Sequence, residues 1–191
     1  DAYIALSNLY LYSGQEDLAE SQIREAIRLD PDNVDAYLTL GRILHNLKKP
    51  TEALAAYNQA VSKQPGYWRS FNARGIHYYR LGEYPQAIAD FTQVAFLDPT
   101  NTSALNNLGT ARYLNGEFSA AIASWRKSEA IKPNRTALSN IGTGYYYLRD
   151  FQQAANMYTK AIEATPNDHR LWGNLADAQR MAEKNAAART N

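Results

Sequence analysis

Apolar residues recur along the chain at three- and four-residue spacing, which predicts a series of amphipathic helices. The helical segments come in pairs, and five pairs end in similar phrases: EAIRLDP, QAVSKQP, QVAFLDP, KSEAIKP and KAIEATP. The prolines that close these phrases stand 34, 34, 34 and 33 residues apart. Because proline lacks an N–H and clashes with the preceding turn, each one marks the end of a helix.

When each closing proline is numbered as position 32 of its unit, residues of similar size recur at the same positions in successive units. Position 8 reads Ser7, Gly41, Gly75, Gly109 and Gly142. Position 24 reads Ile23, Tyr57, Phe91, Trp125 and Tyr158. Small residues let two helix backbones approach closely, and large residues fill the space beside them. The columns therefore predict a pair of antiparallel helices in each unit.

Glycine and proline mark the turn inside the unit. Gly14, Gly82 and Gly116 fall at position 15, where the first helix is expected to stop. Pro50 and Pro85 fall at positions 17 and 18, where a second helix can begin with a proline.

These columns resemble the tetratricopeptide repeat family, whose pattern has a large residue at position 4, Gly or Ala at 8, Ala at 20 and 27, an aromatic at 24 and Pro at 32. The resemblance implies an all-α fold, a right-handed α-solenoid of antiparallel helix pairs. It divides the chain into a single solenoid of five repeats, residues 1–33, 34–67, 68–101, 102–134 and 135–168, with a partial sixth over 169–191. Members of the family are interaction scaffolds, so the resemblance also implies a protein-binding module.

Local departures from the family pattern are expected to alter curvature but not the fold. Arg74 replaces Leu at position 7, while Val94 and Ser128 replace Ala at position 27. The sixth repeat is expected to supply only its first helix, LWGNLADAQRM. Because both ends of the chain fall inside a repeat, we expect it to have been cut from a longer protein.

Composition and charge exclude several classes of protein. The 191 residues include 20 Lys and Arg against 19 Asp and Glu, so the basic excess of a nucleic-acid-binding protein is missing. The chain has no cysteine, which excludes disulfides and thiolate sites. No apolar run approaches the roughly 20 residues that cross a bilayer, so we expect no membrane insertion.

No catalytic or metal-binding set is recognisable. His45, His77 and His169 form no i, i+4 pair with another ligand, so we expect no metal site. The glycines are isolated at packing and turn positions, and they form no phosphate-binding loop. No nucleophile lies with a base and an orienting group. We therefore predict no catalytic residues, no cofactor and no enzymatic activity.

The resemblance places positions 2, 5, 6, 9, 12 and 13 of the first helices on a concave groove. Asn107, Asn140 and Asn174 occupy position 6 of three successive repeats. A carboxamide both donates and accepts hydrogen bonds, so such a row can hold the main chain of an extended peptide. Helix propensity does not explain the recurrence, since asparagine is a mediocre helix former. The alternative is that asparagine merely tolerates a hydrated face.

Residues at other groove positions are candidates for selecting which peptide binds. Tyr79, Tyr113 and Tyr146 at position 12 have aromatic rings with polar tips, which suit recognition, although packing between neighbouring helices would explain them equally well. Arg69 and Arg170 occupy position 2. Residues 67–191 contain 14 basic and 10 acidic residues, which favours a mildly acidic partner.

Two hypotheses of function follow. The first is a non-catalytic module that binds an extended peptide or partner segment in its groove through these asparagines, tyrosines and arginines. The alternative is a structural or assembly module, acting by docking onto a catalytic domain of a larger signalling protein or by self-association. A homo-oligomer would form through the C-terminal helix, where an apolar face around Trp172 favours end-to-end pairing. The carboxylate clamp of chaperone-binding repeats is absent, which disfavours that partner.

Overall fold

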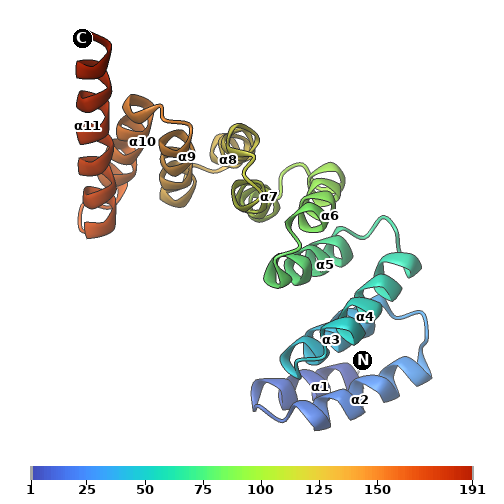
Figure 1. Ribbon diagram of the computed structural model, residues 1–191. Coiled ribbons are helices and arrows are strands. Elements are labelled where there is room, and N and C mark those ends of the chain that lie inside the picture. The colour runs from blue at the N-terminus through green and yellow to red at the C-terminus, as the bar shows by residue number, and fades with distance from the viewer. Residues whose placement is uncertain (1, 191) are drawn as a thin grey trace. The chain divides into compact units, whose positions relative to one another are not determined.

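The structure is a computed structural model that describes residues 2–190; Asp1 and Asn191, which the predicted repeats include, lie outside the described residues. Over this range the chain is helical between short turns (Figure 1). The helices are α1 (Ala2–Tyr12), α2 (Glu16–Leu29), α3 (Val34–Asn46), α4 (Pro50–Lys63), α5 (Trp68–Leu81), α6 (Tyr84–Leu97), α7 (Thr102–Leu114), α8 (Phe118–Ile131), α9 (Arg135–Tyr147), α10 (Phe151–Ala164) and α11 (His169–Thr190). The prediction of an all-α chain is confirmed.

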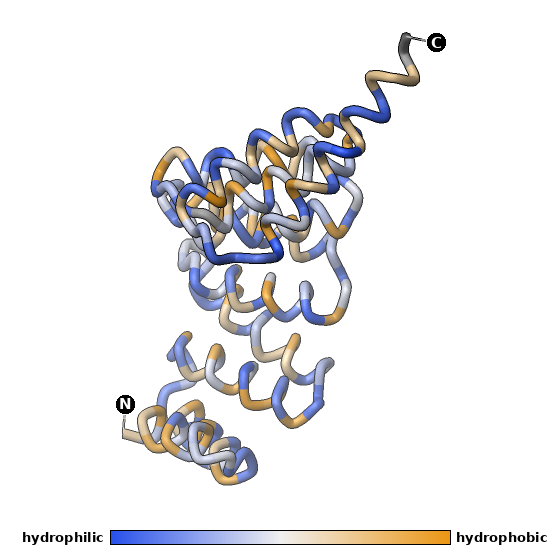
Figure 2. Tube along the Cα trace, turned by 90° about the vertical axis from the view of Figure 1, so that its left-hand side faces the viewer, coloured by the Kyte–Doolittle hydropathy of each residue, from blue (hydrophilic) through white to orange (hydrophobic). Residues whose placement is uncertain are grey.

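Consecutive helices pack as hairpins, α1 with α2, α3 with α4, and so on to α9 with α10, while α11 packs on α10. The chain forms two compact units, unit 1 (Asp1–Asp98) and unit 2 (Pro99–Asn191). Within each unit, every hairpin contacts the next one along the chain. Hydrophobic and hydrophilic residues alternate along the helices in Figure 2, as expected where each helix buries one face.

In three hairpins, an asparagine caps the start of the first helix. The side chains of Asn33, Asn101 and Asn134 each accept a hydrogen bond from a backbone N–H three residues later, at 3.1, 3.0 and 2.8 Å. Such a bond satisfies one of the N–H groups that a helix start leaves unpaired. Asn33 and Asn101 stand two residues after their prolines, whereas Asn134 follows Pro133 directly. The turn is one residue shorter there, but the asparagine still caps the helix.

The position 8 glycines lie against the position 24 aromatic rings. A Cβ atom added to Gly109 would lie 2.4 Å from Nε1 of Trp125, and one added to Gly41 would lie 2.5 Å from the Tyr57 ring. Trp125 is only 2% exposed, and its Nε1–H donates to the Asn106 carbonyl at 3.2 Å. The predicted pairing of small with large columns is therefore confirmed.

The turn inside each hairpin uses a left-handed residue. Gly14, Gly82 and Gly116 have φ values of 71°, 80° and 81°. Lys48 and Arg149 take the same place in the other two hairpins, with φ values of 60° and 62°. The helix ends predicted at the three glycines are confirmed. Lys48 and Arg149 adopt the same left-handed conformation, although a side chain makes it less favourable.

The last helix is longer than predicted. α11 spans 22 residues and continues from LWGNLADAQRM through AEKNAAART. This extension has no Gly or Pro and is rich in Ala with Glu, Lys and Arg, which favour helix. Leu171, Leu175 and Ala178 are buried in a cluster with residues of α10. Despite its length, α11 is too polar to cross a membrane, and no other helix among residues 2–190 is long and apolar enough to do so.

Candidate functional site

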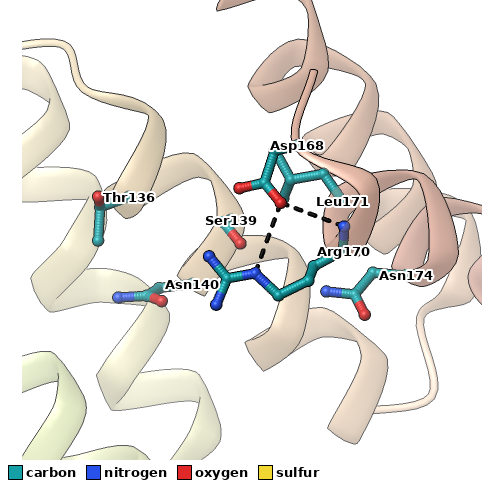
Figure 3. A pocket seen from close by; sticks show the side chains of 7 residues that line it. All are labelled: Thr136, Ser139, Asn140, Asp168, Arg170, Leu171 and Asn174. Atoms are coloured by element: carbon teal, nitrogen blue, oxygen red, sulfur yellow. Dashed lines mark hydrogen bonds and ion pairs between the residues drawn. The ribbon is translucent and has the colours of Figure 1, made fainter. Parts of the chain in front are cut away.

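Unit 2 has a hollow of about 330 Å³ between α9 and α11, which we call the unit 2 hollow (Figure 3). It is lined by Thr136, Ser139, Asn140, Asp168, Arg170, Leu171 and Asn174. Three of the residues predicted from the groove columns therefore lie together: Asn140 on α9, and Arg170 and Asn174 on α11. Their polar groups can donate and accept hydrogen bonds toward a ligand.

Arg170 is anchored by the residue before the helix. Asp168 Oδ1 accepts a hydrogen bond from the Arg170 backbone N–H at 3.1 Å and lies 3.5 Å from its Nε. The Asp168 side chain is 16% exposed, whereas that of Arg170 is 89% exposed. In Figure 3 the Arg170 side chain extends from α11 toward Ser139 and Asn140 of α9, and Asn174 lies on the other side of its guanidinium. A cation is thus held beside two carboxamides on an accessible surface.

Asn107 lies at the same helix position as Asn140, one hairpin earlier in unit 2. It is half-buried on α7 and does not line the unit 2 hollow. Two of the three asparagines therefore line one hollow. The contribution of Asn107 stays a prediction.

The position 12 tyrosines pack on the second helix of their own hairpins. The paired rings are Tyr79 with Tyr84 at 6.1 Å, Tyr113 with Phe118 at 5.7 Å and Tyr146 with Phe151 at 5.2 Å. All three tyrosines are half-buried. Burial also raises the pKa of Tyr113 to about 12. Packing accounts for their placement, and their role in peptide selectivity stays a prediction.

Arg69 and Tyr79 belong to unit 1, so the eight predicted residues are divided between the two units. Arg69 lines a hollow of unit 1 whose other residues, Tyr57 apart, also stand at the groove positions, among them Arg42 at position 9 and Arg80 at position 13.

His45 and His77 meet inside unit 1, where their ring centroids lie 5.3 Å apart. His77 is 2% exposed, and its Nε2–H donates to the Pro50 carbonyl at 3.0 Å, while its Nδ1 is buried without a hydrogen bond. Burial, together with the positive charge of Arg80, lowers the pKa of both imidazoles. Among residues 2–190, no group of three or more His, Asp or Glu side chains could hold a metal ion.

We expect acid to destabilise the protein through His77. An unfolded histidine has a pKa near 6.5, and the folded value is lower, so the unfolded state binds more protons. Stability should therefore fall as the pH drops below about 6.5. His77→Gln should flatten the pH dependence of the free energy of unfolding, measured by urea denaturation. A pH dependence that stays as steep in His77→Gln as in the unmodified protein would contradict the assignment.

Comparison with known proteins identifies the repeat. The family model for the tetratricopeptide repeat matches residues 4–67, 72–135 and 140–190. The chain belongs to the tetratricopeptide repeat (TPR) family. No curated protein sequence matches it significantly.

Solved TPR structures share the fold. A TPR protein from Parabacteroides merdae is 23% identical, with a TM-score of 0.82 over 99% of this chain and 75% of that one. MamA is 22% identical, with a TM-score of 0.78 over 88% of this chain and 93% of that one. YrrB, described as a TPR protein with an unusual peptide-binding site, is 21% identical, with a TM-score of 0.76 over 90% and 89%. At these identities the likeness shows the fold alone.

Proposed function

We propose that this TPR protein is a non-catalytic binding module that holds an extended protein segment in the unit 2 hollow. The observation that supports the proposal is the convergence of Asn140, Asn174 and Arg170 on one accessible surface. Carboxamides can pair with the N–H and C=O groups of a peptide backbone, and the guanidinium can pair with a carboxylate. Asn107, at the same position of α7, would extend the contact along the segment. The peptide-binding site described for YrrB supports this choice within the shared fold.

A structural or assembly role is the alternative, and one observation favours it. Trp172 of α11 is 50% exposed, which is unusual for so large an apolar ring. However, its Nε1–H already donates to the Pro166 carbonyl at 2.8 Å, so the indole is fixed within its own turn. One exposed ring is a small surface for stable association, and we therefore favour peptide binding.

The test begins with a peptide selected from a random-sequence display library on the full chain. Its Kd is then measured by fluorescence polarisation for the protein and for Asn140→Ala with Asn174→Ala. Loss of two hydrogen-bonding groups worth about 1 kcal/mol each should weaken binding about ten- to thirtyfold.

The matched control removes two asparagines from a different surface. Asn156 of α10 and Asn185 of α11 lie outside the unit 2 hollow, and Asn156→Ala with Asn185→Ala should retain the affinity of the unmodified protein. Unchanged affinity in the Asn140 and Asn174 variant would show that the hollow is not the binding surface.

A further inference from the structure

Helix α5 has a polar face where the other first helices have an apolar one. Positions 3, 7 and 10 of its repeat are Ser70, Arg74 and His77, and their spacing of four and three residues places them on one side of the helix. We call these three residues the α5 seam. The same positions hold small or aliphatic residues in the neighbouring repeats: Ala36, Leu40 and Ile43 in α3, Ala104, Leu108 and Ala111 in α7, and Ala137, Ile141 and Gly144 in α9.

The α5 seam is directed at α4, the second helix of the preceding hairpin. Arg74 Nη1 donates to Asn58 Oδ1 at 2.8 Å, and His77 Nε2–H donates to the Pro50 carbonyl at 3.0 Å. Ser70 is fully buried, but its Oγ has no hydrogen-bond partner, and neither has Nδ1 of His77. A buried polar atom without a partner costs free energy, so the contact between α5 and α4 is less favourable than an apolar one.

The apolar core of unit 1 stops at the same place. Its buried cluster comes from α2, α3 and α4, and among the described residues α5 adds to it only the half-buried Ala73. In unit 2, by contrast, Ile141 of α9 clusters with Ile122 and Trp125 of α8. A Cβ atom added to Gly144 would lie 2.6 Å from the Ile122 side chain. The junction of α4 with α5 therefore relies on polar contacts where that of α8 with α9 relies on apolar packing.

His77 is the residue of the α5 seam whose charge can change near neutral pH. From α4 it faces the Tyr57 ring, whose centroid lies 5.4 Å away, and burial keeps that hydroxyl neutral by raising its pKa to about 12. From α3 it faces His45, with the ring centroids 5.3 Å apart. The positive charges of Arg80 and Lys48 act on this pair of imidazoles, Arg80 on both and Lys48 on His45.

The remaining charges at the seam balance each other. The Arg74 guanidinium forms an ion pair with Asp90 of α6, at 2.7 Å, so this carboxylate is already occupied. The other groups that face His77 are neutral or positive. A proton on Nδ1 would therefore add a buried charge beside other cations, together with a donor that has no acceptor.

We infer that the α5 seam is a pH-sensitive hinge, at which protonation of His77 separates α5 from α4 while the helices stay folded. Water solvates the added charge and its N–H once the seam is open. The ion pair of Arg74 with Asp90 is kept, because both residues belong to the hairpin of α5 and α6. The short turn over residues 64–67, which joins α4 to α5 in Figure 1, contains the exposed Gly66, and this hairpin moves about it as one body. The hinge lies within unit 1 and does not depend on peptide binding in unit 2.

The test measures how often the seam opens. Because the chain has no cysteine, Ser70→Cys places a single thiol on the seam, and it removes no hydrogen bond made by Ser70 Oγ. The rate at which a pyridyl disulfide modifies this thiol is divided by the rate for Ser62→Cys, an exposed site on α4, at the same pH. This ratio cancels the thiol's own pH dependence. It should rise as the pH falls below about 6.5, approaching about tenfold for each pH unit, because opening takes up one proton. Far-UV circular dichroism should stay constant over the same range.

Two matched variants assign the effect. With His77→Gln in the Ser70→Cys chain, the ratio should keep its value at neutral pH, because an amide donates to the Pro50 carbonyl but takes up no proton. Ala137→Cys, fully buried at the same position of α9, should show no rise, because α9 packs on α8 through apolar residues.

Three results would overturn the inference. They are a Ser70→Cys ratio that does not change with pH, a rise that persists in the His77→Gln variant, and an equal rise in Ala137→Cys. The last result would mean that acid unfolds the whole chain rather than opening one seam.

Discussion

Trp125→Ala should lower the free energy of unfolding by about 3–5 kcal/mol. The indole is almost completely buried, and it clusters with Ile122, Ile141 and Met157 of three successive helices. Its removal leaves a cavity beside Gly109, where the glycine has no side chain to fill the space. The Asn106 carbonyl also loses its indole donor. Urea denaturation followed by circular dichroism measures the loss.

Trp172→Ala is the matched control, because it removes the same side chain from a half-exposed site. It should cost less than about 1 kcal/mol, since little apolar area is returned to water. Equal losses in the two tryptophan variants would contradict the packing described for α7 and α8.

Arg74→Leu should destabilise the protein by about 3–5 kcal/mol, although leucine is the residue that the family pattern favours at this position. Arg74 Nη2 lies 2.7 Å from Asp90 Oδ1, and its Nε lies 2.8 Å from Oδ2. The Asp90 side chain is only 6% exposed, so the substitution would leave a buried carboxylate without its cation. These hydrogen bonds also raise the pKa of the Arg74 guanidinium.

The double variant Arg74→Leu with Asp90→Ala should recover most of that loss. Leu40 and Ala56 occupy the corresponding positions of the preceding hairpin, where both are buried. An apolar pair can replace a buried ion pair at little cost, and often at a gain. Chemical denaturation of both single variants and the double variant gives the interaction energy. Arg74→Leu alone being neutral or stabilising would show that the ion pair is not needed.

This pair also shows where a sequence pattern stops being informative. Arg74 stands out as a departure from its column, but its partner does not, because position 23 has no fixed residue type in the family pattern. Asp90 becomes significant only when α5 and α6 are packed together. The packing of Gly109 on Trp125 was predictable, since both residues belong to columns that recur in every repeat.

Most residues that line the two hollows were recognisable from sequence, because they stand at the groove positions. Asn140, Asn174 and Arg170 could be nominated from sequence because they occupy columns that share one helix face. Arg42 and Arg80 stand at positions 9 and 13, which also belong to the groove positions, and they line one hollow of unit 1. The tyrosines at position 12 could not be assigned from sequence, because the aromatic residue that each one packs on lies outside the family pattern.

The position of a bound peptide tests the proposed function most directly. A spin label on the library-selected peptide broadens NMR signals of nearby side-chain amides, which can be observed for asparagine in nitrogen-15-labelled protein. The unit 2 hollow predicts the strongest broadening at Asn140 and Asn174. Strongest broadening at Asn156 and Asn185, outside the hollow, would contradict it.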